Sequence, residues 1–196
     1  MVTRIDDARI LPMRARREAT VDDLYKFTGD GKAELVDGRL VVMSPIGHAH
    51  ARASMRIAAS LDEYARRTKR GEAFGDSVGF VVGLAHRRSF SPDAAYYVGP
   101  AFGPKFIEGS PVFAVEVRSP EDYGPFADRA YAQKRADYFA AGTLVVWDVD
   151  VARDGWIRVY RASDPENPAE YRRGEAAEAE PALPGWTFAV DDAFLD

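Results

Sequence analysis

Strand-like runs and helical patterns alternate along this chain, and their order limits the fold more than any other feature. Helical spacing of apolar residues marks the stretches at about 48–69 and 126–141, after a short helix with a capping box at Thr20 and Asp23. Strands occurring singly and in hairpins between helices predict a mixed β-sheet flanked by helices, in the α/β class. The runs typical of strands lie at 33–36, 39–44, 77–84, 94–98, 112–118, 144–149 and 156–162.

A length of 196 residues suits one domain, which we expect to span 19–196 behind a basic, irregular arm at 1–18. The sequence has no cysteine, no apolar segment of a secretory signal near its start and no run long enough to cross a membrane. We therefore expect a cytoplasmic protein without membrane contact. The net charge of −5 argues against a broad polyanion binder, although the arginines at 52, 56, 66 and 67 leave room for a local basic groove.

The run Phe113–Arg118, FAVEVR, has a glutamate at its centre although it otherwise resembles a buried strand. Alternate residues of a strand share a face, so Glu116 and Arg118 point one way, and Val115 and Val117 point the other. One interpretation is a half-exposed strand with both charged residues in solvent. The other interpretation is that Glu116 has a chemical role in a buried site.

Two further charged residues have positions that favour the second interpretation. Asp93 ends the turn Ser-Pro-Asp directly before the run at 94–98, although an ordinary turn-capping aspartate would stand there too. Lys134 falls on the predicted inward stripe of the second long helix, although a lysine can also extend from such a stripe to water. The rest of that stripe is Ala127, Ala130, Tyr131, Tyr138 and Ala141.

Two carboxylates and an ammonium group that converge would suit phosphodiester hydrolysis. Carboxylate oxygens and water are the ligands that Mg²⁺ prefers. The cation would polarise a phosphoryl oxygen, and Lys134 would stabilise negative charge on the phosphate or orient the attacking water.

The order Asp93, Glu116 and a following basic residue resembles the PD-(D/E)xK motif of restriction-endonuclease-like nucleases. The chain is most similar to the Uma-type endonucleases in that superfamily. The matching residues occur between positions 33 and 185: Ala33–Gly38, Val42–Pro45, His50, Leu61, Pro92–Asp93, Val115–Pro120, Asp128, Lys134, Tyr138, Ala141–Gly142, Trp147–Asp150 and Leu183–Gly185.

This resemblance implies a restriction-endonuclease-like mixed sheet, with Asp93, Glu116 and the backbone carbonyl of Val117 as metal ligands. The superfamily lysine stands two residues after the glutamate, where this chain has Arg118. The Uma-type branch moves that lysine to the next helix, which matches Lys134. Arginine keeps its proton, so we expect Arg118 to contact a phosphate or to form an ion pair.

Two other positions match the family. Glu34 would reach the metal through a water or from a second layer, unless it is an ordinary outward-facing strand residue. His50 would contact a phosphate or orient Glu34, unless it is structural. Ser119 shows no histidine partner in the sequence, so a serine hydrolase is disfavoured.

We therefore expect a Mg²⁺-dependent endonuclease acting on DNA, with Mn²⁺ able to substitute and a homodimer as one possible assembly. The alternative is a catalytically silent nuclease fold that binds nucleic acid or a regulatory partner. A protein-interaction domain using Tyr96, Tyr97, Trp147 and Trp156 is a third, weaker interpretation.

Overall fold

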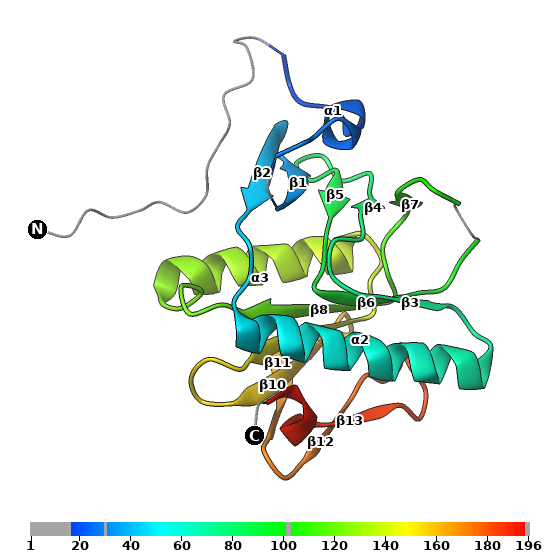
Figure 1. Cartoon of the computed structure of the whole chain (residues 1–196), viewed down its shortest axis with the longest axis vertical. Helices are drawn as coiled ribbons and strands as arrows, with labels where there is room; N and C mark the ends of the chain where they lie inside the picture. Colours follow the sequence, from blue (N-terminus) through cyan, green and yellow to red (C-terminus); the bar gives the residue numbers. More distant parts are fainter. Residues whose placement is uncertain (1–16, 30, 101–102, 195–196) are drawn as a thin grey trace, which may run out of the picture.

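The computed structural model describes residues 17–29, 31–100 and 103–194. Its centre is a six-stranded sheet in the order β11-β10-β9-β8-β6-β3, in which β8 and β9 are parallel and every other pair is antiparallel (Figure 1). The mixed sheet flanked by helices confirms the predicted fold class. The arm predicted at 1–18 lies almost entirely outside the described residues.

The strands of the central sheet come from widely separated parts of the chain. They are β3 (Glu72–Phe74), β6 (Ala94–Tyr97), β8 (Phe113–Arg118), β9 (Val145–Asp150), β10 (Trp156–Arg161) and β11 (Asp164–Arg172). The smaller strands are β1 (Lys32–Val36) with β2 (Arg39–Met43), then β4 (Phe80–Val81), β5 (Ser89–Phe90) and β7 (Ile107–Glu108), and finally β12 (Ala176–Glu178) with β13 (Thr187–Ala189).

Two long helices, α2 (His48–Thr68) and α3 (Pro125–Ala140), cover opposite faces of the sheet (Figure 1). Ile57 and Leu61 of α2 pack in one core with Val115 of β8. Tyr138 of α3 packs in the second core with Ala114, which precedes Val115 and therefore points to the other face. The charged Glu116 shares the face of Ala114 and lies beneath α3.

Several local predictions are confirmed in detail. The short helix α1 (Val21–Tyr25) begins with a reciprocal capping box between Thr20 and Asp23. In the β1–β2 hairpin, Asp37 and Gly38 both have positive φ, +48° and +65°, which is the turn geometry that Asp-Gly favours. Hairpin β1–β2 and the small sheet of β4, β5 and β7 lie together above one end of the central sheet (Figure 1).

Other predictions need correction. The strand expected at 77–84 is only Phe80–Val81, and Ala130 on the predicted inward stripe of α3 is exposed. The polar, proline-rich stretch 164–185, whose composition predicts a hairpin with a long loop or an irregular strap, contains β11, which pairs with β10 along one edge of the central sheet. An edge strand tolerates Pro165 and Pro168 because one of its sides needs no hydrogen-bonding partner. The chain closes with the 3₁₀ turn η1 (Val190–Ala193).

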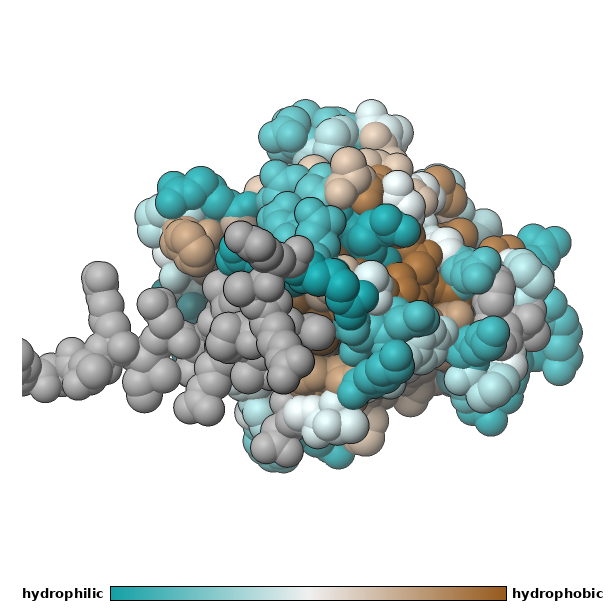
Figure 2. Space-filling model, turned by 90° about the horizontal axis from the view of Figure 1, so that it is seen from above, coloured by the Kyte–Doolittle hydropathy of each residue, from teal (hydrophilic) through white to brown (hydrophobic). Residues whose placement is uncertain are grey.

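The face of the molecule seen from above in Figure 2, on the side of hairpin β1–β2 and the small sheet, carries both hydrophilic and hydrophobic residues. Hydrophilic residues cover much of it, and a smaller area of hydrophobic residues shows between them (Figure 2). In the described part of the chain, no helix is both long and apolar enough to cross a membrane.

Candidate active site

Asp93 is held against β8 beside Glu116. The N–H group of Asp93 donates to the carbonyl of Val115 at 3.0 Å, and the N–H group of Val117 donates to Asp93 Oδ2 at 2.8 Å. Glu116 lies between these two backbone positions. Both carboxylates are buried, with 4% and 8% of the residue exposed, so the half-exposed strand is the wrong interpretation of FAVEVR.

Lys134 reaches Glu116 from α3. Its Nζ lies 2.8 Å from Glu116 Oε2 and 2.9 Å from Glu34 Oε1. The hydroxyl of Tyr138, one helical turn later, donates to Glu116 Oε1 at 2.7 Å. Both oxygens of Glu116 therefore accept a hydrogen bond from α3.

The electrostatics follow from this burial. Burial raises the pKa of Glu116 above its ordinary value, and the negative charges of Asp93 and Glu34 raise it further. The positive charge of Lys134 lowers this pKa but does not outweigh the burial. For Lys134, burial favours the neutral amine, but Glu116 and Glu34 outweigh it and raise the pKa above the ordinary value. Lys134 is therefore an ammonium ion at neutral pH and suits charge stabilisation rather than proton abstraction.

Glu34 faces inward rather than outward. It accepts from the N–H group of Ser91 at 2.8 Å, and its Oε2 lies 2.5 Å from Arg87 Nη1. Arg87 in turn binds Asp137 through Nε at 2.7 Å. Burial would raise the pKa of Glu34, but Lys134 and Arg87 lower it, so Glu34 is an ionised anchor for the Lys134 ammonium group.

His50, at the start of α2, contacts Asp93 and Ser119. Its Nε2 lies 3.0 Å from Asp93 Oδ2, although the direction is poor for a hydrogen bond. Its Nδ1 lies 3.1 Å from Ser119 Oγ. Contrary to the expectation from the sequence, Ser119 therefore has a histidine neighbour, because the fold brings together residues 69 positions apart. Asp93 is also bound by Lys32 and by the backbone of β8, so the group does not resemble an isolated Ser-His-Asp triad.

Arg118, two residues after Glu116 on β8, is also buried. Its Nε and Nη2 each donate to Asp148 at 2.8 Å, and Nη1 donates to Asp128 at 2.8 Å. Its guanidinium lies 4.7 Å from the ring centre of Tyr131. Of the two roles expected for Arg118, these contacts fit the ion pair.

Sequence reasoning missed Lys32 and Arg87. Lys32 Nζ lies 2.7 Å from Asp93 Oδ1 and 2.6 Å from Asp76 Oδ1. A signal was available for Lys32, because it is two residues before Glu34 on one strand and therefore shares its face. Arg87 lies in a polar segment with no periodic pattern, so nothing in the sequence marks it as buried.

The donors around Asp93 and Glu116 suit a divalent cation in kind. In the described part of the chain, no three acidic or histidine side chains converge as a ready-made metal cluster. Mg²⁺ needs few protein ligands because it keeps several waters, so two carboxylates and one carbonyl would suffice. The carbonyl of Val117 is well placed, because in an extended strand it points to the same side as its N–H group, which binds Asp93.

The described residues also leave negative charge in excess around this position. Two neighbouring groups of ion pairs, one around Lys32 and the other around Arg87 and Lys134, together hold five carboxylates against these three cationic side chains. The carboxylates are those of Glu34, Asp76, Asp93, Glu116 and Asp137. An added cation would therefore meet a favourable field.

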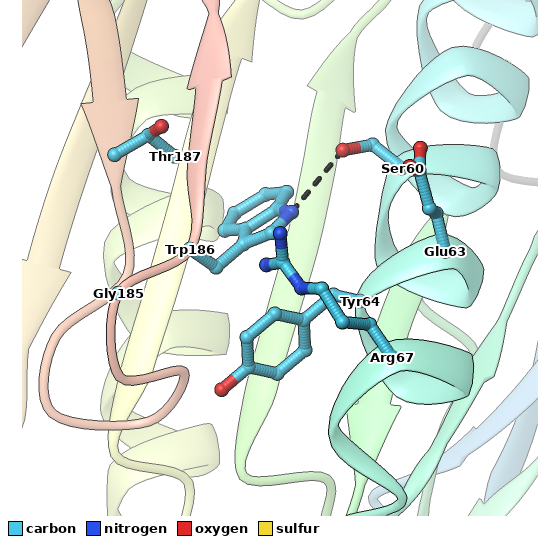
Figure 3. Close-up of a pocket in the computed structure, with 7 residues that line it drawn as sticks. All are labelled: Ser60, Glu63, Tyr64, Arg67, Gly185, Trp186 and Thr187. Carbon is cyan, nitrogen blue, oxygen red and sulfur yellow. Dashed lines mark hydrogen bonds between the residues drawn. The ribbon is translucent and has the colours of Figure 1, made fainter.

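A separate cavity of about 190 Å³ lies between α2 and the segment before β13 (Figure 3). Tyr64 and Arg67 extend toward it from α2, and Trp186 Nε1 donates to Ser60 Oγ at 3.1 Å across one side. None of the residues predicted to act in catalysis lines this cavity.

The sequence matches the model of a known protein family. The sequence model of the family described as "Uma2: Putative restriction endonuclease" matches residues 19–191. The chain belongs to this family. The match confirms the resemblance drawn from the sequence, and it includes each of the site residues described above.

A solved structure shares the Uma2 chain's fold. It is the "crystal structure of a putative nuclease belonging to DUF820 from Anabaena variabilis ATCC 29413", with a TM-score of 0.69 at 16% sequence identity. The similarity covers 89% of this chain and 96% of that chain, and at this identity it shows the fold. A search of curated proteins gave no match.

Proposed function

We propose that this protein is a metal-dependent endonuclease that hydrolyses phosphodiester bonds in DNA, with Mg²⁺ as its cofactor and Mn²⁺ as a substitute. Membership of the Uma2 family supports a nuclease. The observation on which the proposal depends is that buried Asp93 is held against β8 beside buried Glu116 of that strand, with the Lys134 ammonium group 2.8 Å from Glu116.

Each site residue has a role that its contacts support. Asp93, Glu116 and the Val117 carbonyl would hold the cation, which when bound supplies Lewis-acid stabilisation of the phosphate. Glu34 would not bind the cation directly but would act from a second layer, by holding the Lys134 ammonium group in place. Lys134 would stabilise the negative charge that grows on the phosphate during cleavage. His50 would fix the orientation of Asp93, to which it lies close, rather than that of Glu34.

The test is cleavage of supercoiled and linear DNA by the whole protein with Mg²⁺, with Mn²⁺ and with a chelator. We expect the wild type to cut only with metal, and Glu116→Gln and Lys134→Met each to lower the rate by about 100-fold or more. Glu170→Gln, on the exposed edge strand β11, is the matched control and should keep full activity. Equal cutting by wild type and Glu116→Gln would trace the activity to a contaminant.

A silent nuclease fold that binds nucleic acid is the second candidate. It is favoured by the fact that all four carboxylate oxygens of Asp93 and Glu116 already face a donor within the protein. This candidate predicts metal-independent binding of DNA that weakens with added salt. Charge reversal at Arg52 and Arg66 should then weaken binding, and unchanged binding would exclude this candidate.

A further inference from the structure

Lys32 occupies one oxygen of Asp93, which the proposed function assigns to the metal. The Lys32 Nζ to Asp93 Oδ1 distance is 2.7 Å, which is a short, charge-assisted contact. Asp93 Oδ2 is bound to the backbone of β8. A divalent cation at Asp93 would therefore lie within a few ångströms of a second positive charge, where the repulsion is strong because the site is buried.

Lys32 differs from Lys134 and Arg87 because one of its two carboxylate partners is partly exposed. Lys134 lies between Glu34 and Glu116, and Arg87 lies between Glu34 and Asp137; the side chains of these three carboxylates are at most 10% exposed. Lys32 instead lies between Asp93, whose side chain is 5% exposed, and Asp76, whose side chain is 30% exposed. Lys32 can therefore move away from Asp93 toward the rim and still keep an anionic partner.

We propose that Lys32 is a displaceable counter-ion of the metal site: it neutralises Asp93 when no metal is bound and moves to Asp76 when a divalent cation binds. Asp76 is then a positioning residue that acts through Lys32. This inference rests on the proposed function, because it takes Asp93 as a metal ligand. It adds two residues to the site and assigns them a direction of effect on metal affinity.

The direction in which Mn²⁺ affinity changes when Lys32 is lost distinguishes a competing counter-ion from a structural residue. If Lys32 merely supports the fold, its loss should weaken Mn²⁺ binding or leave it unchanged. If Lys32 competes with the cation, its loss should strengthen Mn²⁺ binding by about tenfold or more, the equivalent of one charge-assisted hydrogen bond. Asp76→Asn, which keeps the side-chain oxygen that accepts from the Ser77 N–H group, should weaken Mn²⁺ binding.

The experiment is titration calorimetry of the whole protein with MnCl₂ in four forms: wild type, Lys32→Met, Asp76→Asn and the double variant. We expect tighter binding by Lys32→Met and no effect of Asp76→Asn once Lys32 is absent, which a double-mutant cycle measures. Lys105→Met, at an exposed lysine, is the control and should match the wild type. Thermal unfolding checks each fold, and Lys32→Gln replaces the methionine variant if that variant does not fold.

Three results decide between the proposals. Tighter binding by Lys32→Met supports the counter-ion role. Equal or weaker binding by Lys32→Met, with a wild type that binds Mn²⁺, overturns this role and leaves the proposed nuclease intact. Absence of Mn²⁺ binding in every form overturns the metal dependence of the proposed function, and with it the role of Lys32.

Discussion

At the scale of single residues, Glu116 shows how a buried strand can hold a carboxylate. Burial of a lone charge is costly, so each oxygen needs a donor, and Lys134 and Tyr138 of α3 supply them. The helical stripe predicted that Lys134 faces inward from α3, where it could converge with the two carboxylates. The sequence could not predict Arg87 or the contact of His50 with Ser119, because these depend on distances between elements that no local pattern records.

Asp137 allows a test of this network away from the proposed metal ligands. Burial would raise the pKa of Asp137, but hydrogen bonds from Arg87, Gln133 and His86 lower it. Because its folded pKa lies below the unfolded value of about 3.9, ionised Asp137 stabilises the fold above that pH. This contribution is lost as the pH falls through the folded pKa.

We therefore expect Asp137→Asn to lower the free energy of unfolding more at pH 7 than at about pH 3. Urea unfolding of both proteins across this range measures the difference, with the exposed Asp154→Asn as the matched control. A difference that stays constant or widens toward acid pH would contradict the ion-pair account of Asp137.

At the scale of elements, β8 and α3 are joined by two charged layers. Lys134 binds Glu116 in one layer, and Arg118 binds Asp128 and Asp148 in the next. The sequence predicted both long helices and four of the six central strands nearly to the residue, but it gave no strand at the three residues of β3. It missed β11 because Pro165 and Pro168 resemble loop residues when the neighbouring strand is unknown.

Loss of Arg118 should destabilise the fold rather than only the site. Arg118→Met leaves Asp148 buried without its main partner, which typically costs about 3–5 kcal/mol. Arg129→Met, on the exposed side of α3, should change stability by less than about 0.5 kcal/mol. Chemical denaturation measures both, and similar stabilities for the two variants would show that the Arg118 layer contributes little.

At the scale of the whole molecule, the candidate site depends on how the sheet is assembled. Hairpin β1–β2 contributes Glu34 and Lys32, the start of β6 contributes Asp93, and α2 and α3 contribute His50 and Lys134. The spacing of all of these residues except Lys32 matched a known family, which is how their convergence could be expected. The strand order β9-β8-β6-β3, which makes convergence possible, is not encoded in any local pattern.

The central claim is that Asp93 and Glu116 hold one divalent cation while Lys134 lies beside it. The most direct measurement is an anomalous difference map from a crystal of the protein soaked in Mn²⁺. We predict one strong peak within about 2–2.5 Å of a carboxylate oxygen of each residue and of the Val117 carbonyl. A protein that cleaves DNA with Mn²⁺ but shows its manganese peak away from both carboxylates would contradict the account.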